Sequence, residues 1–397
     1  MEFAKRYFVR RRNLWSSEFK NPKALYESGC ESVMSLAYVC GSEVLRPNYT
    51  RKNRRLAILF ADFILYLVLS FWCTTVFWGR LNDVIFCFVT IGGAIQAFAK
   101  ISSYTGKGLY DLHLRNLENF KNDRNYDEVQ EIMMNVATIC KLSVTVFKII
   151  FSGMVGLVMF YSIGGSIMGE HYVLPFGYYF PFIDPDTLVG FVVNFSYQLT
   201  FIIYAYCGLQ ASDLVFLYLI MHAIGATETI IIYLRKLNHL ISSNGASSCL
   251  DLLHDIIEKH IKLTEYSKDM NDLLKMGIFI NFGSLVAQTV FSCFVLATAE
   301  EIWYTGLAIV VLSTVQLFTA CLLGTLLSSK NDQLIREIYD ISWNNLPIEA
   351  QKSLQLLLHS AQQPMVLSDG FNAVDLFYFV TIYKQIYSFV AMLLNFN

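Results

Sequence analysis

The sequence RKNRRLAILFADFILYLVLSFWCTTVFWGR at residues 51–80 decides the class of fold. It places four basic residues directly before a mainly apolar run from Leu56 to Trp78. A membrane-spanning helix needs about 20 mainly apolar residues, so this run is long enough to cross a bilayer. A basic flank of this kind is typical of the cytoplasmic end of such a helix.

Six further runs of the same kind follow along the chain: Leu81–Ala99, Leu142–Ile163, Leu188–Ala223, Met276–Ala297, Gly306–Leu327 and Leu376–Asn395. The run from Leu188 is too long for one crossing. Gln210, Ser212 and Asp213 lie in its inner half, and no proline or glycine turn separates two halves. We therefore expect one continuous helix that projects into the cytoplasm.

The composition agrees with a protein that is solvated mainly by lipid. Of the 397 residues, 55% are hydrophobic and only 16% are charged, and the mean hydropathy is +0.44. A soluble domain usually carries about 25% charged residues. The net charge of −2 gives no argument for a nucleic-acid partner.

Basic residues fix the expected orientation. The segments 1–55, 100–141, 224–275 and 328–375 hold 27 of the 30 lysines and arginines, and the opposite side of the membrane holds Arg80 alone. Loops rich in lysine and arginine remain in the cytoplasm. The sequence therefore predicts an all-α membrane protein with seven transmembrane helices, a cytoplasmic N-terminus and an extracellular C-terminus.

Three other classes of protein fit poorly. A G-protein-coupled receptor has the opposite orientation, and the loop 164–187 contains no cysteine that could form its usual disulfide. A transporter usually shows repeated hydropathy in its two halves, and none is visible. The histidines lack metal-ligand spacing, and we expect no enzymatic activity, no metal and no cofactor.

The seventh run carries a mainly polar stripe. Thr381, Gln385, Ser388, Met392 and Asn395 recur at spacings of four and three, which places them on one helix face. In lipid such a face needs water or protein as a neighbour. Two interpretations remain open, a pore lining or a helix-packing face. The predicted extracellular loops contain five acidic residues and one basic residue, Arg80, and this excess of negative charge favours a route for cations. The acidic residues are Glu170, Asp184, Asp186, Glu300 and Glu301.

The C-terminal segment resembles the insect odorant receptor family. The matching residues are Ile338-Tyr339, Trp343, Leu346-Pro347, Ala361-Gln362, Pro364, Gly370-Phe371, Phe379, Lys384 and Tyr387-Ser388. A gustatory receptor of the same superfamily is the alternative, although Thr381-Ile382-Tyr383 and Asn395-Phe396 only approximate its pattern.

The resemblance implies a subunit of a heterotetrameric, odorant-gated cation channel in the plasma membrane of olfactory sensory neurons. Its partners would be coreceptor subunits, a small volatile odorant and membrane lipid. Because the second cytoplasmic loop is only 224–275, the chain resembles a tuning subunit. We expect four parts: a cytoplasmic segment 1–55, helices with the odorant pocket 56–327, cytoplasmic anchor helices 328–371, and a pore helix 372–397. The pore and gate residues would be Ser388, Met392, Asn395 and Phe396.

The same resemblance implies an odorant pocket in the outer half of the bundle, between the second and sixth spans. The candidate lining residues there are mainly aromatic side chains and methionines: Phe86, Thr90, Met154, Val158, Met159, Phe195, Gln198, Phe291, Phe294 and Tyr304. Such a lining suits a volatile ligand that is held by burial and shape. The loop HYVLPFGYYFPFIDPD at 171–186 either covers this pocket or lies at the membrane interface.

Overall fold

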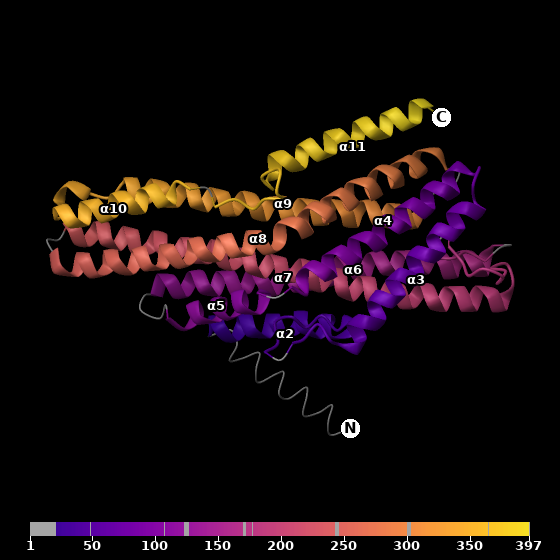
Figure 1. Cartoon of the computed structure of the whole chain (residues 1–397), viewed down its shortest axis with the longest axis horizontal. Coiled ribbons are helices and arrows are strands. Elements are labelled where there is room, and N and C mark those ends of the chain that lie inside the picture. The colour runs from indigo at the N-terminus through magenta and orange to yellow at the C-terminus, as the bar shows by residue number, and fades with distance from the viewer. Residues whose placement is uncertain are drawn as a thin grey trace, which may run out of the picture.

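The computed structural model describes residues 21–47, 49–106, 108–122, 127–169, 172–176, 178–242, 246–299, 303–363 and 365–396. These residues form an elongated bundle of nearly parallel and antiparallel helices (Figure 1). Within the described part no strand forms, and the one extended contact is an isolated bridge between Ser368 and Ala373. The all-helical prediction is confirmed.

Among the described residues, seven helices are long and apolar enough to cross a membrane, as predicted. They are α3 (Arg54–Val76), α4 (Leu81–Tyr104), α6 (Asp127–Met168), α7 (Leu188–Ser242), α8 (Ala246–Thr298), α9 (Tyr304–Tyr339) and α11 (Leu376–Phe396). The long fourth run is one unbroken helix of 55 residues. The prediction of one continuous helix is therefore confirmed, and α7 is far longer than the roughly 20 residues that one crossing needs.

Two helices extend well beyond the apolar runs from which we predicted their spans. The amphipathic stretch Leu250–Lys275 continues into the fifth span as α8, and Asn331–Tyr339 is the end of α9. Residues 243–245, between α7 and α8, lie outside the described residues. Together with α5 (Leu109–Asn122), η1 (Trp343–Asn345) and α10 (Ile348–Ala361), these extensions form one end of the molecule (Figure 1).

One basic residue that we assigned to a loop belongs to a span. Lys100 lies inside α4, and its side chain is only 3% exposed because it forms an ion pair with Asp213 of α7. Four more residues extend the second span beyond Lys100, to Tyr104. An acid on a neighbouring helix can keep a lysine inside a span, and the local sequence does not show such a partner.

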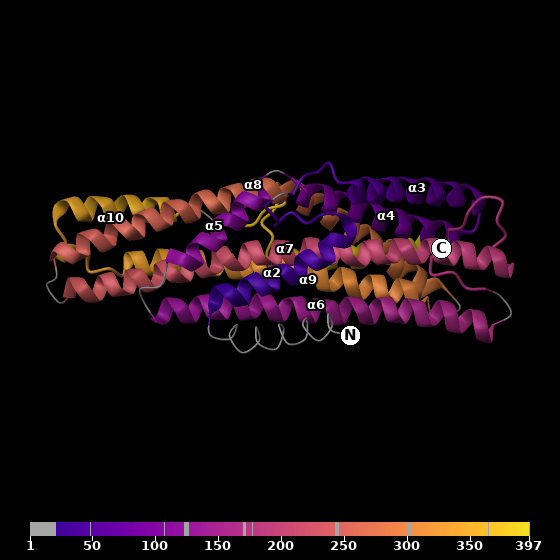
Figure 2. The ribbon, with the colours of Figure 1, turned by 90° about the horizontal axis from the view of Figure 1, so that it is seen from below.

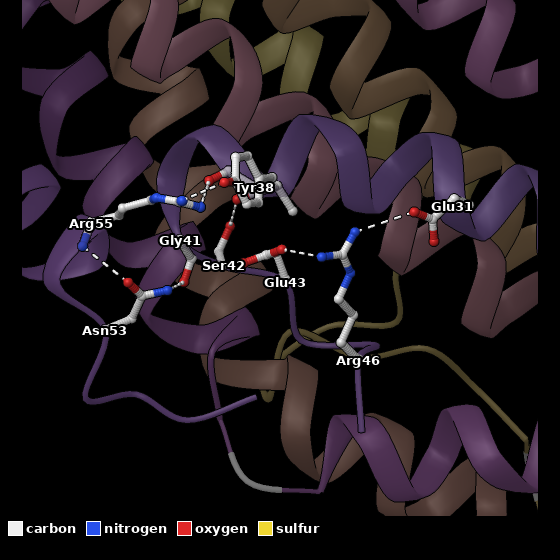
Figure 3. A network of polar contacts seen from close by, with 9 residues as sticks. Glu31, Tyr38, Gly41, Ser42, Glu43, Arg46, Asn53 and Arg55 are labelled. Atoms are coloured by element: carbon white, nitrogen blue, oxygen red, sulfur yellow. Dashed lines mark hydrogen bonds and ion pairs between the residues drawn. The ribbon is translucent and has the colours of Figure 1, made fainter. Parts of the chain in front are cut away.

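The corner between α2 (Pro22–Cys40) and α3 sets how the chain enters the membrane. Asn21 caps α2 by accepting a hydrogen bond from the N–H of Lys23, and Gly41 ends the helix at φ +68°. Figure 3 shows that Asn53 joins the two helices: it caps α3 and donates to the Gly41 carbonyl at 3.3 Å. Arg55 then donates to the carbonyl of Tyr38 and lies over its ring at 3.6 Å.

α7 is the central helix of the bundle, and α11 lies at its periphery. In the most apolar 18-residue stretch of each helix, 89% of α7 is buried inside the protein, but only 11% of α11 is. α7 contacts α2, α4, α5, α6, α8 and α9, whereas α11 contacts α8 and α9. Figure 1 shows α11 as a separate helix along the upper edge, with the C-terminus at its far end. One long face of α11 is therefore left without a neighbour in the single chain.

Candidate functional site

An apolar cavity of about 130 Å³ lies between α6, α7 and α9. Each helix contributes four residues at the spacing i, i+3, i+4 and i+7, which defines one helix face. These twelve residues are Phe151, Met154, Val155, Val158, Ile202, Ala205, Tyr206, Leu209, Thr305, Ala308, Ile309 and Leu312. Phe176, from the loop that precedes α7, completes the lining.

The polar groups of this lining already have partners. The phenol oxygen of Tyr206 lies 2.9 Å from the hydroxyl of Ser152. The hydroxyl of Thr305 donates to the carbonyl of Pro175 at 3.1 Å. A guest in the cavity would therefore contact mainly carbon atoms, and shape and apolar area would determine what fits.

The loop 172–187 is fixed to the surrounding helices by side chains that contact its backbone. Gln198 of α7 accepts from the N–H of Phe176 at 2.8 Å and donates to the carbonyls of Phe176 and Tyr178 at 3.0 and 2.6 Å. Asn194 accepts from the N–H of Phe180 at 2.7 Å. Thr305 provides a third attachment, from α9. The loop that supplies Phe176 is therefore held in one position relative to the cavity.

The structure brings together only some of the predicted pocket residues. Met154 and Val158 line the cavity, whereas Gln198 binds the loop backbone. Phe86, Phe291 and Phe294 gather elsewhere, near Trp303: the rings of Phe86 and Trp303 are 4.7 Å apart, and Phe291 and Phe294 belong to one small cluster around Trp303.

The other predicted pocket residues lie apart from the cavity lining. Thr90 is buried and donates to the carbonyl of Cys87 in its own helix. Tyr304 packs on Tyr161, and Phe195 packs on Phe191. Met159 is half-buried on α6, one position after the cavity residue Val158. The cavity residues of α7 and α9 were not among the predicted pocket residues, because their i, i+3, i+4, i+7 spacing recurs on every face of an apolar helix.

The polar stripe of α11 faces away from the rest of the chain. Ile382 and Ile386 are buried against the bundle, whereas Gln385, Ser388, Met392 and Asn395 are exposed. Thr381 is half-buried at the start of the stripe. The side chain of Phe396 lies outside the described part, as do the loop acids Glu170, Glu300 and Glu301. The predicted pore residues whose side chains are described thus share an accessible face.

α9 contacts both the cavity and α11. Thr305, Ala308, Ile309 and Leu312 line the cavity on one side of this helix. On another side the hydroxyl of Thr314 lies 2.5 Å from the phenol oxygen of Tyr383. Two further contacts to α11 follow along α9, a ring contact from Phe318 to Phe379 and a hydrogen bond from the N–H of Leu376 to Thr325.

A buried polar network ties α9 to the other helices. Lys100 of α4 binds Asp213 of α7 and donates to Gln316 of α9 at 2.8 Å. Gln96 of α4 donates to the same Gln316 oxygen at 3.0 Å and to Asn281 of α8 at 2.9 Å. α4, α7, α8 and α9 therefore meet through directional contacts, which favour one relative arrangement over a continuous range.

Comparisons with known proteins agree with this architecture. The sequence model of the family described as "7tm Odorant receptor" matches residues 109–387. A solved structure of the insect olfactory receptor OR5 from Machilis hrabei in complex with eugenol is similar, with a TM-score of 0.82 and 12% identity. The match covers 95% of this chain and all of that one. A second structure of OR5 from Machilis hrabei gives a TM-score of 0.75 and 13% identity over 92% of this chain and 97% of that one.

Proposed function

This chain belongs to the 7tm odorant receptor family, and we propose on that basis that it is the odorant-binding subunit of a heterotetrameric cation channel. It is a multi-pass membrane protein of a family of ligand-gated channels, not of enzymes. Coreceptor subunits would complete the tetramer, and the assembly would lie in the plasma membrane of olfactory sensory neurons. The family match favours this function over a gustatory receptor.

The apolar cavity between α6, α7 and α9 is our proposed odorant site, and it is the observation that carries the proposal. An apolar cavity of about 150 Å³ can stay dry and bind a molecule as small as benzene. The cavity here, at about 130 Å³, suits a guest of similar size. Burial of apolar area contributes about 25 cal/mol per Å², so affinity would rise with the fit of the guest.

We propose that α9 transmits occupancy of this cavity to α11. A ligand shifts an equilibrium only by its difference in affinity for the two states. Because α9 forms one cavity wall and also holds α11 through Thr314 and Thr325, a displacement of the wall changes both contacts. The polar network at Gln316 would confine that displacement to discrete positions.

α11 is the proposed pore helix, with Ser388, Met392, Asn395 and Phe396 as pore and gate residues. The exposure of its polar stripe supports a lining that faces water rather than lipid. The predicted orientation places the end with Asn395 on the extracellular side. The proposed organisation keeps the four parts 1–55, 56–327, 328–371 and 372–397, with the segment 328–371 as the anchor between subunits.

A pair of variants on adjacent positions of α9 tests the proposed site. Ala308 is buried at the cavity wall, whereas Leu307 is 40% exposed on the outer face. We expect Ala308→Phe to fill the cavity and to raise the odorant concentration for half-maximal current at least tenfold. Leu307→Phe adds a ring outside the cavity and serves as the matched control.

The measurement is odorant-evoked current in cells that also express the coreceptor, with a panel of volatiles that includes eugenol. The cavity assignment would be disproved if Ala308→Phe and the parent needed the same concentration of every active volatile for half-maximal current. Current without the coreceptor that equals current with it would contradict the heteromeric assembly.

A further inference from the structure

A groove of about 390 Å³ runs between α2 and α6. α2 lies on the opposite side of the bundle from α11 in Figure 1, and Figure 2 shows α2 beside α6. Gly29 and Ser32 of α2 form part of one wall. The other wall is α6, with two basic and two hydroxyl side chains: Lys141, Thr145, Lys148 and Ser152. It shares no residue with the odorant cavity.

The four polar residues of α6 form one stripe. They recur at spacings of four, three and four, and the two lysines are separated by two helical turns, about 10 Å along the axis. The ammonium group of Lys141 donates to the hydroxyl of Ser28 at 3.1 Å, which holds it at the mouth of the groove. Lys148 forms no ion pair with any residue that the structure describes.

The side chains beside the stripe place it at a lipid boundary. Leu142 is 60% exposed and Ile149 is 67% exposed, although both are large and apolar. Exposed apolar side chains of this size on a spanning helix face lipid. Lysines among them extend toward the phosphate level of the bilayer. The predicted orientation puts this end of α6 in the cytoplasmic leaflet, where the anionic lipids lie.

The described acids of α2 next to the groove have basic partners outside its lining. Its described lining residues include no carboxylate. On the adjacent helix α2, Glu27 pairs with Lys23 at 3.5 Å, and Glu31 binds Arg46 at 3.2 Å (Figure 3). Arg46 also holds Glu43 at 2.7 Å, so its guanidinium group is shared by two acids. Among the described residues, no carboxylate forms an ion pair with Lys148, and an anionic ligand would supply that charge.

We propose that the groove between α2 and α6 binds the headgroup of an anionic phospholipid from the cytoplasmic leaflet. The lysines would contact the phosphate groups, and the hydroxyls of Thr145 and Ser32 would accept or donate hydrogen bonds to the headgroup. An acyl chain would then lie along Ile149. The bound lipid would join α2 to α6 and thereby secure the N-terminal helix to the bundle. This site shares no lining residue with the proposed odorant cavity, although Ser152 of the groove contacts Tyr206 of that cavity.

Native mass spectrometry of the purified full chain tests the proposal. The protein is titrated with dioleoyl phosphatidylinositol 4-phosphate, with dioleoyl phosphatidylcholine and with free inositol phosphate. We expect the anionic lipid to bind in preference to both other probes. Lys148→Gln and Lys141→Gln should each weaken it about fivefold, because one lysine near the membrane surface contributes about that factor. Lys148→Arg should retain binding.

The matched control is Lys352→Gln, which removes an exposed charge from α10 far from the groove and should bind like the parent. The proposal fails if the double variant Lys141→Gln and Lys148→Gln binds the anionic lipid as well as the parent does. It also fails if the parent binds phosphatidylcholine or free inositol phosphate as tightly as it binds the anionic lipid. This comparison uses the parent alone, so it does not depend on whether a variant folds. Photocrosslinking from position 149 must capture lipid, and capture of a protein chain would overturn the assignment.

Discussion

The hydroxyl of Thr314 on α9 lies 2.5 Å from the phenol oxygen of Tyr383 on α11. This is the one hydrogen bond between side chains that joins the proposed pore helix to α9 among the described residues. Thr314 stands two positions after the cavity residue Leu312 on the same rigid helix. The bond therefore lies between the proposed odorant site and the proposed pore.

A double-mutant cycle measures this contact. Thr314→Val and Tyr383→Phe each remove one hydroxyl while they keep the shape of the side chain. We expect either change to lower the free energy of unfolding by about 1 kcal/mol, the usual net value of such a bond. The double variant should lose little more, because only one bond exists to be lost. Thermal unfolding of the purified chain is the measurement, and additive losses would show that the two hydroxyls act separately.

Gln198 is expected to control the loop over the cavity. Gln198→Leu leaves an N–H and two carbonyls of the loop without their partner, at a cost of about 1–3 kcal/mol for each buried group. The loop 172–187 should then exchange its amide hydrogens faster, and odorant sensitivity should fall about tenfold. Thr200→Val on the exposed face of α7 is the matched control. Unchanged amide exchange in the loop would refute the anchoring role.

Acid should weaken the packing of α5 through His113. Burial lowers the pKa of His113 to about 4 from its ordinary value of 6.5, and its side chain stacks beside Tyr26. Between pH 6.5 and 4 the unfolded chain therefore takes up a proton that the folded chain excludes. Stability should be complete above pH 6.5 and should fall by up to about 3 kcal/mol as the pH drops to 4.

The measurement for His113 is the free energy of unfolding as a function of pH. In His113→Gln the loss of stability between pH 6.5 and 4 should be smaller than in the parent. His239→Gln replaces an exposed histidine and should keep the parental slope. Equal slopes in the parent and in His113→Gln would exclude the histidine as the source.

The sequence predicted the number and order of the spans because each span is a local property. About 20 apolar residues suffice to define one, and the fourth run, from Leu188, needed only the absence of a turn signal. Lys100 shows the limit. It was assigned to the loop 100–141, yet it lies in α4, where a partner on another helix stabilises it.

The cavity was harder to predict than the spans. Periodicity identifies an apolar helix face only when the other faces are polar, and a spanning helix is apolar all round. Nothing local therefore distinguishes Ile202 or Ile309 in the cavity from lipid-facing neighbours such as Ile203. Gln198 was assigned to the pocket from its place in the outer half of the bundle, but its amide matches the backbone of a loop about 20 residues earlier.

We expect the protein to lose stability when one member of the ion pair between Lys100 and Asp213 is replaced, and to keep most of its stability when both are replaced. Their side chains are 3% and 14% exposed, so removal of one partner leaves an uncompensated charge inside the bundle. Lys100→Met should therefore cost about 3–5 kcal/mol, whereas Lys100→Met combined with Asp213→Leu should recover most of that loss. The exposed pair of Arg115 and Asp269 is the matched control, and Arg115→Met should cost under about 1 kcal/mol. Thermal unfolding midpoints and surface expression provide the comparison. A double variant as unstable as Lys100→Met alone would mean that hydrogen bonding to Gln316, rather than the compensation of charge, determines the role of Lys100.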